Sequence, residues 1–363
     1  MQLLSAHRIL SGLLATVVLA TTAPACARGN CLGDINGDNT VDAADLAALL
    51  IEWGNGAAKS SADLNADGTV NAADLSAMLV AWGPCVNTPP WATLLEALPD
   101  PAVVADSGHR AAITATGLPW RVRDTATGVE MVLIPPGTFN MGCSIYNGGN
   151  CSSNQNPRHA VTITNAFYIG RYEIKQSEWT ARMGSNPSNF QSSIDAANHP
   201  VEMVSWDGIQ GFLASTGFRL PSEAEWEYAY RAGTDTSYHA APGYPAGFEG
   251  PEPLDLIAWF VDNAGENGGP TWGTKRVGLK AANGFGVHDM SGNVWEWVND
   301  WYGASYYSSS PATNPPGPAS GDRRVVRGGS WVTPSQLLTA SIRDNAYPDL
   351  TNINLGFRVV RNP

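Results

Sequence analysis

Apolar side chains recur with a helical period twice near the start of the chain. Each set follows the spacing i, i+3, i+4 and i+7, and the two sets are Leu46, Leu49, Leu50 and Trp53, then Leu75, Met78, Leu79 and Trp82. This spacing predicts two short helices with one apolar face each, and Gly54 and Gly83 follow as C-terminal stops. Each helix buries little surface alone, so we expect the two to pack face to face.

Further along, short apolar runs alternate with helical patterns. The runs predict strands at residues 129–134, 161–164, 167–172, 324–327 and 356–360. Helices are predicted at residues 176–183, 206–215 and 222–231, the last opened by a capping box of Ser222 and Glu225. Because Glu223, Glu225 and Glu227 alternate, they do not share one helix face, and we expect them to act as caps and as buried partners of loop amides. The 38 Gly and 25 Pro add many loops, so the fold class is α+β with long irregular stretches.

The segment between these two regions is rich in proline. Pro89 and Pro90 open it, residues 91–98 are predicted to form a short helix, and Pro99 and Pro101 end that helix. We therefore expect residues 87–114 to be a linker between a module at 28–86 and a large domain at 115–363.

Oxygen-bearing side chains repeat just before each N-terminal helix. Positions 1, 3, 5, 7, 9 and 12 of a twelve-residue loop are Asp34, Asn36, Asp38, Thr40, Asp42 and Asp45, and 29 residues later Asp63, Asn65, Asp67, Thr69, Asn71 and Asp74. This is the ligand spacing of an EF-hand, in which position 7 lends its backbone carbonyl to Ca²⁺. The sequence predicts two calcium sites; the alternative for a single such loop is a solvated turn. Asn39 at position 6, where Gly usually makes the turn, is expected to weaken the first site.

The acidic balance of the chain restricts its partners. The formal net charge is −12, and residues 31–85 carry eight acids against one base, Lys59. Nucleic acids and anionic membranes attract basic surfaces, so neither is expected as a partner.

The first residues have the pattern of a secretory signal. His7 and Arg8 precede an apolar run at 9–20 that is too short to span a membrane, and no later segment is apolar enough to do so. Cleavage after Ala27 would make 1–27 a signal peptide and leave four cysteines; the alternative is a lipoprotein anchor on Cys26. In an oxidising compartment we expect the pairs Cys31–Cys85 and Cys143–Cys151, with four free thiols as the alternative. The predicted location is secreted, outside the cytoplasm.

The duplicated loops, with aspartate at position 12, resemble dockerin modules of extracellular polysaccharide-degrading systems. The resemblance implies a small all-α module of paired loop–helix units and a cohesin-type or other extracellular protein partner. Dockerins contact cohesins through positions 10 and 11, which are Ala43, Ala44, Ala72 and Ala73 here. These alanines offer a small apolar contact and no polar specificity. A structural or other adhesive role is the alternative.

Four motifs follow in order in the second half of the chain. They are Arg219-Leu-Pro-Ser-Glu-Ala-Glu-Trp-Glu-Tyr228, Asp289-Met-Ser-Gly-Asn-Val-Trp-Glu-Trp297, Arg327-Gly-Gly-Ser-Trp331 and Asn354-Leu-Gly-Phe-Arg358. Together they resemble the formylglycine-generating enzyme family, the sulfatase-modifying factor domain. The resemblance implies an irregular fold similar to C-type lectins.

The resemblance also implies an oxidation reaction, but this chain lacks the two cysteines that carry it out in the family. The family's enzymes carry two cysteines, three and eight residues beyond the motif serine, that bind copper(I) and oxidise a substrate cysteine to formylglycine. Those positions are Thr333 and Leu338 here, and a hydroxyl and a methyl group do not replace thiolates. We therefore expect no copper, no catalytic residues and a domain that binds a ligand. The alternatives are a surviving oxidase and an accessory component of a polysaccharide-degrading assembly.

Two further sites follow from the same resemblance. A third calcium ion is expected at Asp289, Gly292, Val294 and Glu296, where the alternative is that the two acids cap irregular backbone. The C-terminal loops of this scaffold also serve as ligand platforms in other proteins, which implies a glycan or peptide site. The candidate residues for it are aromatic, charged or amide side chains, namely Trp331, Arg343, Asp344, Asn345 and Tyr347. For each of them, a purely structural role is the alternative.

Overall fold

The computed structural model describes residues 31–363 except 39, 55–59, 148–150, 267 and 270. The predicted signal peptide at 1–27, the anchor position Cys26 and the loop residue Asn39 lie outside the described residues. Among the residues described, none of the helices is both long enough and apolar enough to cross a membrane.

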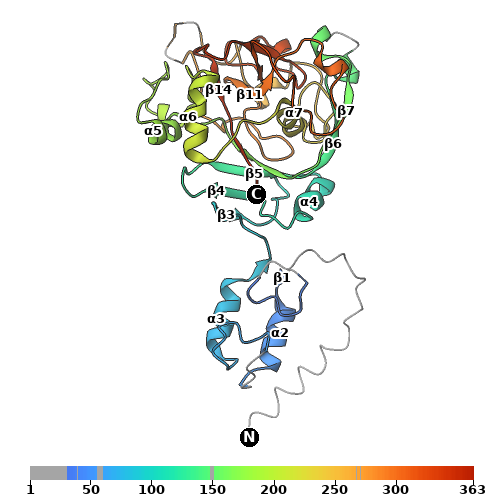
Figure 1. Ribbon diagram of the computed structural model, residues 1–363, viewed down its shortest axis with the longest axis vertical. Coiled ribbons are helices and arrows are strands. Elements are labelled where there is room, and N and C mark those ends of the chain that lie inside the picture. The colour runs from blue at the N-terminus through green and yellow to red at the C-terminus, as the bar shows by residue number, and fades with distance from the viewer. Residues whose placement is uncertain (1–30, 39, 55–59, 148–150, 267, 270) are drawn as a thin grey trace.

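The N-terminal module consists of two helices and one small ladder (Figure 1). Helix α2 spans Ala43–Ile51 and α3 spans Ala72–Val80, while β1 (Thr40–Val41) pairs antiparallel with β2 (Gly83–Pro84). The predicted bridge between Cys31 and Cys85 is confirmed. Each helix starts with a capping box in which the position-9 side chain, Asp42 or Asn71, accepts from the first turn.

The expected face-to-face packing of the two helices holds for half of each apolar set. Leu49 and Met78 are fully buried with Val41, Ala62 and Val70. The outer members stay exposed, and these are Leu50, Trp53, Leu79 and Trp82. Helices of nine residues present about two turns to one another, so the apolar side chains at their outer edges find no cover.

A five-stranded sheet forms the side of the large domain nearest the N-terminal module (Figure 1). Its strands, in spatial order, are β15 (Val360–Arg361), β8 (Phe167–Gly170), β5 (Glu130–Ile134), β4 (Arg121–Asp124) and β3 (Ala92–Glu96). All the neighbouring pairs are antiparallel. The predicted strands at 129–134 and 167–172 are confirmed with slightly shorter bounds.

The predicted linker is instead part of the large domain. Residues 92–96 form the edge strand β3 where a helix was predicted, and α4 (Ser107–Thr114) follows. Val104 and Ile113 are fully buried in the main core. Pairing with β4 gives this segment a partner that its local sequence does not reveal.

A four-stranded sheet carries the C-terminal motifs. Its order is β13 (Asp344–Ala346), β12 (Arg324–Arg327), β11 (Trp295–Trp301) and β14 (Leu355–Phe357). Strand β14 runs parallel to β11, whereas the other two pairs are antiparallel. The predicted strand at 324–327 is confirmed, and the one at 356–360 divides between β14 and β15.

Three helices and two short ladders complete the domain. The helices are α5 (Gln176–Met183), α6 (Trp206–Thr216) and α7 (Glu223–Arg231), as predicted, with Ser222 and Glu225 forming the expected capping box. The ladders pair β6 (Gly137–Met141) with β7 (His159–Ile163) and β9 (Ala258–Trp259) with β10 (Ser291–Gly292). The predicted disulfide between Cys143 and Cys151 is also confirmed.

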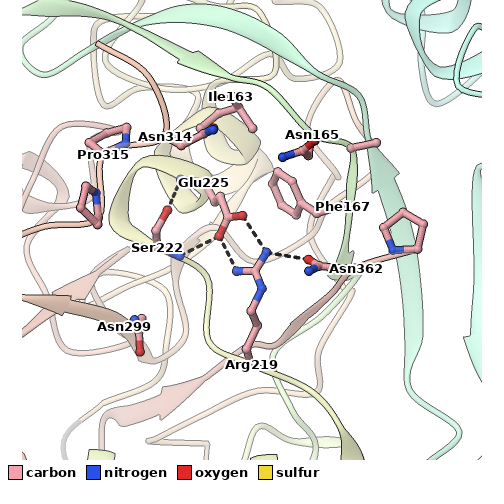
Figure 2. Close-up of a pocket in the computed structure, with 13 residues that line it drawn as sticks. Ile163, Asn165, Phe167, Arg219, Ser222, Glu225, Asn299, Asn314, Pro315 and Asn362 are labelled. Carbon is pink, nitrogen blue, oxygen red and sulfur yellow. Dashed lines mark hydrogen bonds and ion pairs between the residues drawn. The ribbon is translucent and has the colours of Figure 1, made fainter. Parts of the chain in front are cut away.

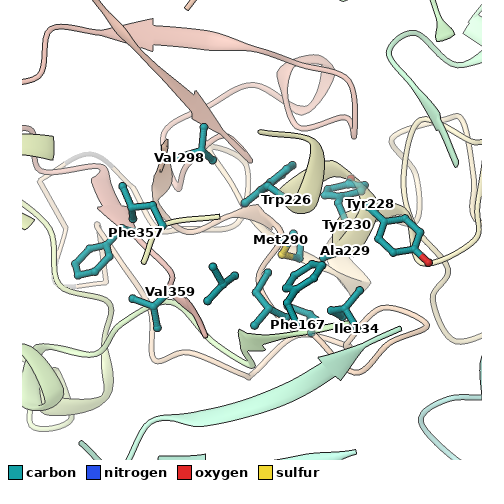
Figure 3. Close-up of a cluster of buried hydrophobic side chains, with 14 of the residues drawn as sticks. Ile134, Phe167, Trp226, Tyr228, Ala229, Tyr230, Met290, Val298, Phe357 and Val359 are labelled. Atoms are coloured by element: carbon teal, nitrogen blue, oxygen red, sulfur yellow. The ribbon is translucent and has the colours of Figure 1, made fainter. Parts of the chain in front are cut away.

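The main core lies between α7 and the two larger sheets. Figure 3 shows Trp226 and Tyr230 of α7 beside Phe167 and Ile134 of the five-stranded sheet, with Phe357 and Val359 farther along. These side chains are almost fully buried. The core therefore fixes the strand ends from which the C-terminal loops leave.

Candidate functional site

The loop after β12 turns sharply at two glycines. Gly328 and Gly329 both have positive φ angles, of 92° and 74°. A Cβ on Gly329 would lie 2.2 Å from Leu338 Cδ2, so only glycine fits between the turn and that side chain. The turn places Ser330 inside the protein, where it is fully buried.

Thr333, at the first family cysteine position, holds this loop closed. Its Oγ1 accepts from the Ser330 backbone N–H at 2.9 Å and lies 2.9 Å from Ser330 Oγ. Asn354 Nδ2 donates to the same Ser330 hydroxyl at 3.2 Å. Thr333 is therefore a buried, hydrogen-bonded structural residue.

Leu338, at the second family cysteine position, belongs to a small separate core. It is fully buried in a cluster that includes Tyr238, Phe248, Leu254 and Ile257. Cys143 and Cys151, the two upstream cysteines of this domain, are bonded to each other. Neither of the two positions supplies a soft donor for copper(I).

A hollow of about 490 Å³ lies beside this loop. Its wall consists of residues from the segments after β9 and β12, namely Val261, Asp262, Asn263, Gly265, Glu266, Trp272, Trp331 and Val332. The Val261 backbone N–H donates to the Thr333 carbonyl at 3.3 Å, so the hollow lies next to the first family cysteine position.

Three aromatic rings support the hollow. The Trp272 and Trp331 rings meet edge to face with centroids 4.5 Å apart, and Phe190 lies 5.4 Å from Trp331 and 5.9 Å from Trp272. Trp331 is buried, while Trp272 is half-buried and Asp262 and Glu266 are exposed. The arrangement combines a rigid aromatic wall with an acidic rim.

The structure divides the five predicted ligand residues among three places. Trp331 lines the hollow. Arg343 is buried in a bidentate ion pair, with its Nε and Nη2 atoms 2.5 and 2.7 Å from the Glu223 carboxylate. The other three, Asp344, Asn345 and Tyr347, lie on or beside edge strand β13.

The patch beside β13 is organised by one arginine. Arg323 donates to Asn345 Oδ1 at 3.0 Å and to the Tyr347 hydroxyl at 3.2 Å, and its guanidinium lies 4.3 Å from the Tyr347 ring centre. Tyr347 stays 49% exposed, which makes it available to a partner.

Sequence reasoning missed Trp272 and Phe190. Both lie outside the four motifs, in loops whose course is not periodic. The available signal was a single tryptophan within a segment rich in glycine and proline, at residues 265–273. That signal does not indicate which other residues the ring would meet.

The acids predicted to bind calcium in the large domain are buried and unequally partnered. Both Glu296 oxygens accept from Arg358, at 2.6 and 2.7 Å, and Trp226 Nε1 donates to one of them at 2.7 Å. Asp289 Oδ2 accepts from the Gly278 N–H at 2.6 Å, whereas Asp289 Oδ1 is buried with no hydrogen-bond partner among the described residues.

Glu173, a third buried acid that the sequence did not indicate, lies close to this pair. It accepts from Asn293 Nδ2 at 2.6 Å and from the Val294 N–H at 3.0 Å. Burial, with the nearby Asp289 and Glu296 carboxylates, raises the pKa of Glu173 well above its ordinary value. Burial also raises the pKa of Asp289 to about 6. One guanidinium thus faces three carboxylates, and a cation bound by Asp289 would relieve the excess of negative charge.

In the N-terminal loops, the acids arrange the backbone around a common centre. Carboxylate oxygens of Asp34, Asp38 and Asp45 come within 4.8 Å of one another. Asp34 Oδ1 accepts from the Gly37 and Asp38 N–H groups, and Asp45 Oδ1 accepts from Ile35 and Asn36.

The second loop repeats several of these hydrogen bonds. Asp63 Oδ1 accepts from the Asp67 N–H at 3.1 Å, and Asp74 Oδ1 accepts from Leu64 at 2.7 Å and Asn65 at 3.2 Å. Hard oxygen donors grouped in this way suit Ca²⁺.

The acids of α7 have structural partners, most of them arginines. Glu225 pairs with Arg219 and accepts a hydrogen bond from the Ser222 N–H. Glu227 accepts from Arg231, from Arg327 and from the Gly142 N–H. The expected loop amide is thus present for Glu227. Glu223 faces Arg343, and the guanidiniums of Arg343 and Arg327 overcome burial to lower the pKa of its carboxyl.

Two family profiles match the chain. The sulfatase-modifying factor enzyme 1-like domain covers residues 120–363, and the dockerin type I domain covers residues 32–79. The formylglycine-generating enzyme of Thermomonospora curvata is 36% identical over 201 residues, which are 51% of this chain and 64% of the relative. The alignment thus spans less than two thirds of the length of that relative.

Solved structures agree on the fold. The chain is similar to Treponema denticola variable protein 1, with a TM-score of 0.55 and 28% identity over 65% of this chain and 95% of the other. It is also similar to PvdO from Pseudomonas aeruginosa, with a TM-score of 0.56 and 25% identity over 67% and 98% of the two chains. The fold is thus the mixed α and β architecture of formylglycine-generating enzymes, and the chain belongs to the sulfatase-modifying factor enzyme 1-like family, with a dockerin type I module before that domain.

Proposed function

We propose that the large domain binds a ligand without oxidising it, in an exported protein that calcium stabilises and a dockerin module attaches. The observation that carries this proposal is the state of the two family cysteine positions. Thr333 uses its hydroxyl to close the loop, and Leu338 fills a separate core. The scaffold keeps its motifs while the residues of the oxidase centre are replaced by packing and hydrogen bonds.

The hollow beside Thr333 supplies a binding surface in place of a reaction centre. A half-buried Trp272, held by Trp331 and Phe190, gives a rigid apolar wall that loses little entropy on binding. The carboxylates of Asp262 and Glu266 and the amide of Asn263 surround it with polar groups. A glycan or a peptide offers matching apolar and polar faces.

The oxidase alternative is tested on the purified mature protein loaded with copper under oxygen. A peptide containing Cys-x-Pro-x-Arg is supplied, and mass spectrometry follows conversion of its cysteine to an aldehyde. The Thermomonospora curvata relative serves as the positive control. We expect no conversion, because no thiolate is present at positions 333 and 338. Conversion above a metal-free blank would overturn the proposal.

The position of the ligand site is tested separately. Glycan and peptide arrays are probed with the protein and with two variants, Trp272→Ala and Tyr347→Ala. We expect Trp272→Ala to abolish the signals that come from this hollow and Tyr347→Ala to leave them, since of these two residues only Trp272 lines the hollow. The opposite pattern would move the site to the patch beside β13.

The N-terminal module supports the attachment role through its exposed apolar side chains. Ala43, Ala44, Ala72 and Ala73 are exposed at the two helix starts. The outer edges of the helices add Leu50, Trp53, Leu79 and Trp82, which are 43–56% exposed. Exposed apolar groups gathered in this way favour a protein partner of the cohesin type.

Membership in a polysaccharide-degrading assembly is a second candidate and depends on the same module. Calorimetric titration with a cohesin domain, with and without chelator, tests it. Binding that chelator abolishes would support the attachment role. Absence of binding to a panel of cohesins would leave the module as a structural spacer.

Calcium is assigned first to the two N-terminal loops. Asp34, Asn36, Asp38, Asp42 and Asp45, with the backbone carbonyl of Thr40, would hold one ion, and the matching residues of the second loop another. In the large domain, Asp289 would supply its unpartnered carboxylate oxygen. The backbone carbonyl oxygens of Gly292 and Val294 would be further ligands. The Glu296 carboxylate would bind the ion only if its ion pair with Arg358 were broken. A bound ion would supply positive charge that draws these oxygens together.

A further inference from the structure

A second, larger hollow lies on the large domain, lined by residues none of which line the hollow beside Thr333. Its volume is about 670 Å³, within the range of small-molecule sites. Figure 2 shows that four asparagines, Asn165, Asn299, Asn314 and Asn362, surround it. They come from four segments far apart in the sequence.

The charged groups of this hollow neutralise one another. Arg219 Nη1 and Nη2 donate to the two Glu225 oxygens at 2.6 and 2.7 Å, in the bidentate geometry drawn in Figure 2. Glu225 also accepts from the Ser222 N–H at 2.8 Å as the helix cap. Because the pair is internally matched, no side chain that lines the hollow carries an unpaired charge.

Two of the four amides build the wall. Asn314 Oδ1 accepts from the Thr164 N–H at 3.0 Å, and its Nδ2 donates to Thr164 Oγ1 at 2.7 Å. Asn362 Oδ1 accepts from Arg219 at 3.0 Å, which leaves its NH₂ group to donate. These contacts fix the positions of both side chains.

The other two amides have free capacity. The exposed Asn299 side chain makes no hydrogen bond to any described residue, so its oxygen and NH₂ group are both available. Asn165 donates weakly to Thr164 Oγ1 at 3.3 Å, and its oxygen is uncommitted within the described chain. An amide offers a donor and an acceptor side by side, as a hydroxyl group also does.

Apolar groups complete the lining. Ile163 at the end of β7 and Phe167 at the start of β8 line it, and Pro315 lies on the opposite side (Figure 2). Pro316 also lines it and is exposed. A ligand for this hollow therefore needs neutral hydroxyl or amide groups together with C–H faces.

The backbone beside the hollow is already paired, which separates two classes of ligand. The Arg219 N–H donates to the Val360 carbonyl at 3.0 Å, and Val360 returns the bond at 2.8 Å. On the other side, the Thr162 N–H donates to Ala312 at 2.8 Å and Asn314 donates to Thr162 at 3.0 Å. An extended peptide that adds a strand needs a free edge, and these two edges are occupied. A ligand of this hollow is therefore recognised by the side-chain amides, which form hydrogen bonds with hydroxyl groups.

We propose that this hollow is a binding site for a neutral saccharide, separate from the ligand site beside Thr333. The free amides of Asn299 and Asn165 pair with its hydroxyl groups. The exposed Pro316 ring contacts its C–H faces. The site acts independently of the proposed function, since its lining shares no residue with the other hollow.

The test is calorimetric titration of the full chain with cellotetraose, xylotetraose and chitotetraose. We expect at least one to bind at millimolar concentration or below. Asn299→Ala and Asn165→Ala should each weaken that binding about 5- to 10-fold, the loss of one or two neutral hydrogen bonds. Asn352→Ala removes an exposed amide outside the hollow and should leave the affinity unchanged.

Three outcomes would overturn the assignment. They are no binding of any of the three saccharides, binding that both asparagine variants leave intact, and displacement of the saccharide by a neutral Ser-Gly octapeptide. Thermal melts confirm that each variant is folded, and the two variants lie on different segments, so loss of one does not remove the test. Trp272→Ala distinguishes the two sites, because it should abolish the array signals that come from the hollow beside Thr333 while leaving this titration unchanged.

Discussion

The two regions of this chain handle negative charge in opposite ways. The N-terminal module turns the carboxylates of three loop acids, one of them fully buried, toward a common centre, while five of its described residues form the fully buried apolar core. The large domain instead pairs several of its buried carboxylates with guanidiniums, as in Arg343–Glu223 and Arg358–Glu296.

The difference lies in where the compensating charge comes from. Buried arginines belong to the chain and are present as soon as it folds. Loop carboxylates that converge without a cation repel one another, so the module depends on its surroundings. Removing the cation should therefore destabilise the N-terminal module most, and removing a buried arginine should destabilise the large domain most.

Removal of one buried arginine should have the largest effect. Arg327 Nη2 lies 2.5 Å from Glu227 Oε2, and its two NH₂ groups also donate to the Ala340 and Ile342 carbonyls. Arg327→Met would leave Glu227 with one guanidinium fewer and two carbonyls unsatisfied. We expect a loss of roughly 3–5 kcal/mol, measured by urea unfolding of the large domain.

Arg323→Met is the matched control for that measurement. Arg323 is partly exposed and contacts Tyr347 and Asn345 at the surface, so its loss should leave the unfolding midpoint close to that of the wild type. Equal effects of the two variants would contradict the contrast between a buried and an exposed arginine.

Calcium removal should have an effect of similar size, confined mainly to the N-terminal module. At about 100 times the dissociation constant, calcium adds roughly 2.7 kcal/mol per independent site. Chelator should therefore lower the melting transition of this module and shift that of the large domain less. Calorimetry resolves the two transitions.

Substituting one acid inside a loop and another outside both loops distinguishes calcium binding from a general effect of negative charge. Asp34→Ala should reduce the calcium response, whereas Glu52→Gln, which neutralises an acid of the same module outside both loops, should preserve it. A melt that chelator leaves unchanged would contradict the assignment of the loops.

The smallest net effect is expected from pH. Burial, with Glu223 nearby, raises the pKa of Asp300 to about 8 from an ordinary value of 3.8. The folded state therefore holds this proton more tightly, so stability is greatest below the ordinary pKa and falls as pH rises toward about 8. Asp300→Asn should remove this dependence, and melting temperatures measured between about pH 6.5 and 8 would show a flatter profile.

Buried histidines partly hide this effect in the wild type. Burial lowers the pKa of both His239 and His288 to about 4. Their contribution is present above the ordinary pKa of 6.5 and is lost as pH falls through about 4, which is the opposite slope. Parallel pH profiles for Asp300→Asn and the wild type would mean that Asp300 does not titrate in this range.

Much of the fold followed from local patterns, and the errors share one cause. The helix at Gln176–Met183 and the strand at Arg324–Arg327 were predicted with their observed bounds, because each has the periodicity or apolar run of its type. Residues 92–96 were predicted as a helix and form β3. Their conformation depends on β4, which follows some 25 residues later and leaves no trace in the local sequence.

The candidate site was predictable where a motif carried it. Trp331 lies within Arg-Gly-Gly-Ser-Trp and was proposed, and it lines the hollow. Trp272 and Phe190 come from separate segments and meet Trp331 only in the folded chain. Arg343 was proposed for a ligand because it lies near that motif, but Glu223, 120 residues away, occupies its guanidinium.

The contact between Gly329 and Leu338 has a consequence for how this chain can change. Leu338 fills a small core against a turn with no room for a Cβ. Replacing it with cysteine alone would remove buried carbon atoms, at about 0.8 kcal/mol for each methylene-sized group. A single thiol would gain no metal in return, since a copper(I) site needs its partner at position 333. A pair of thiols at positions 333 and 338 would therefore need two substitutions, and the cysteine at position 338 alone would leave a less stable domain.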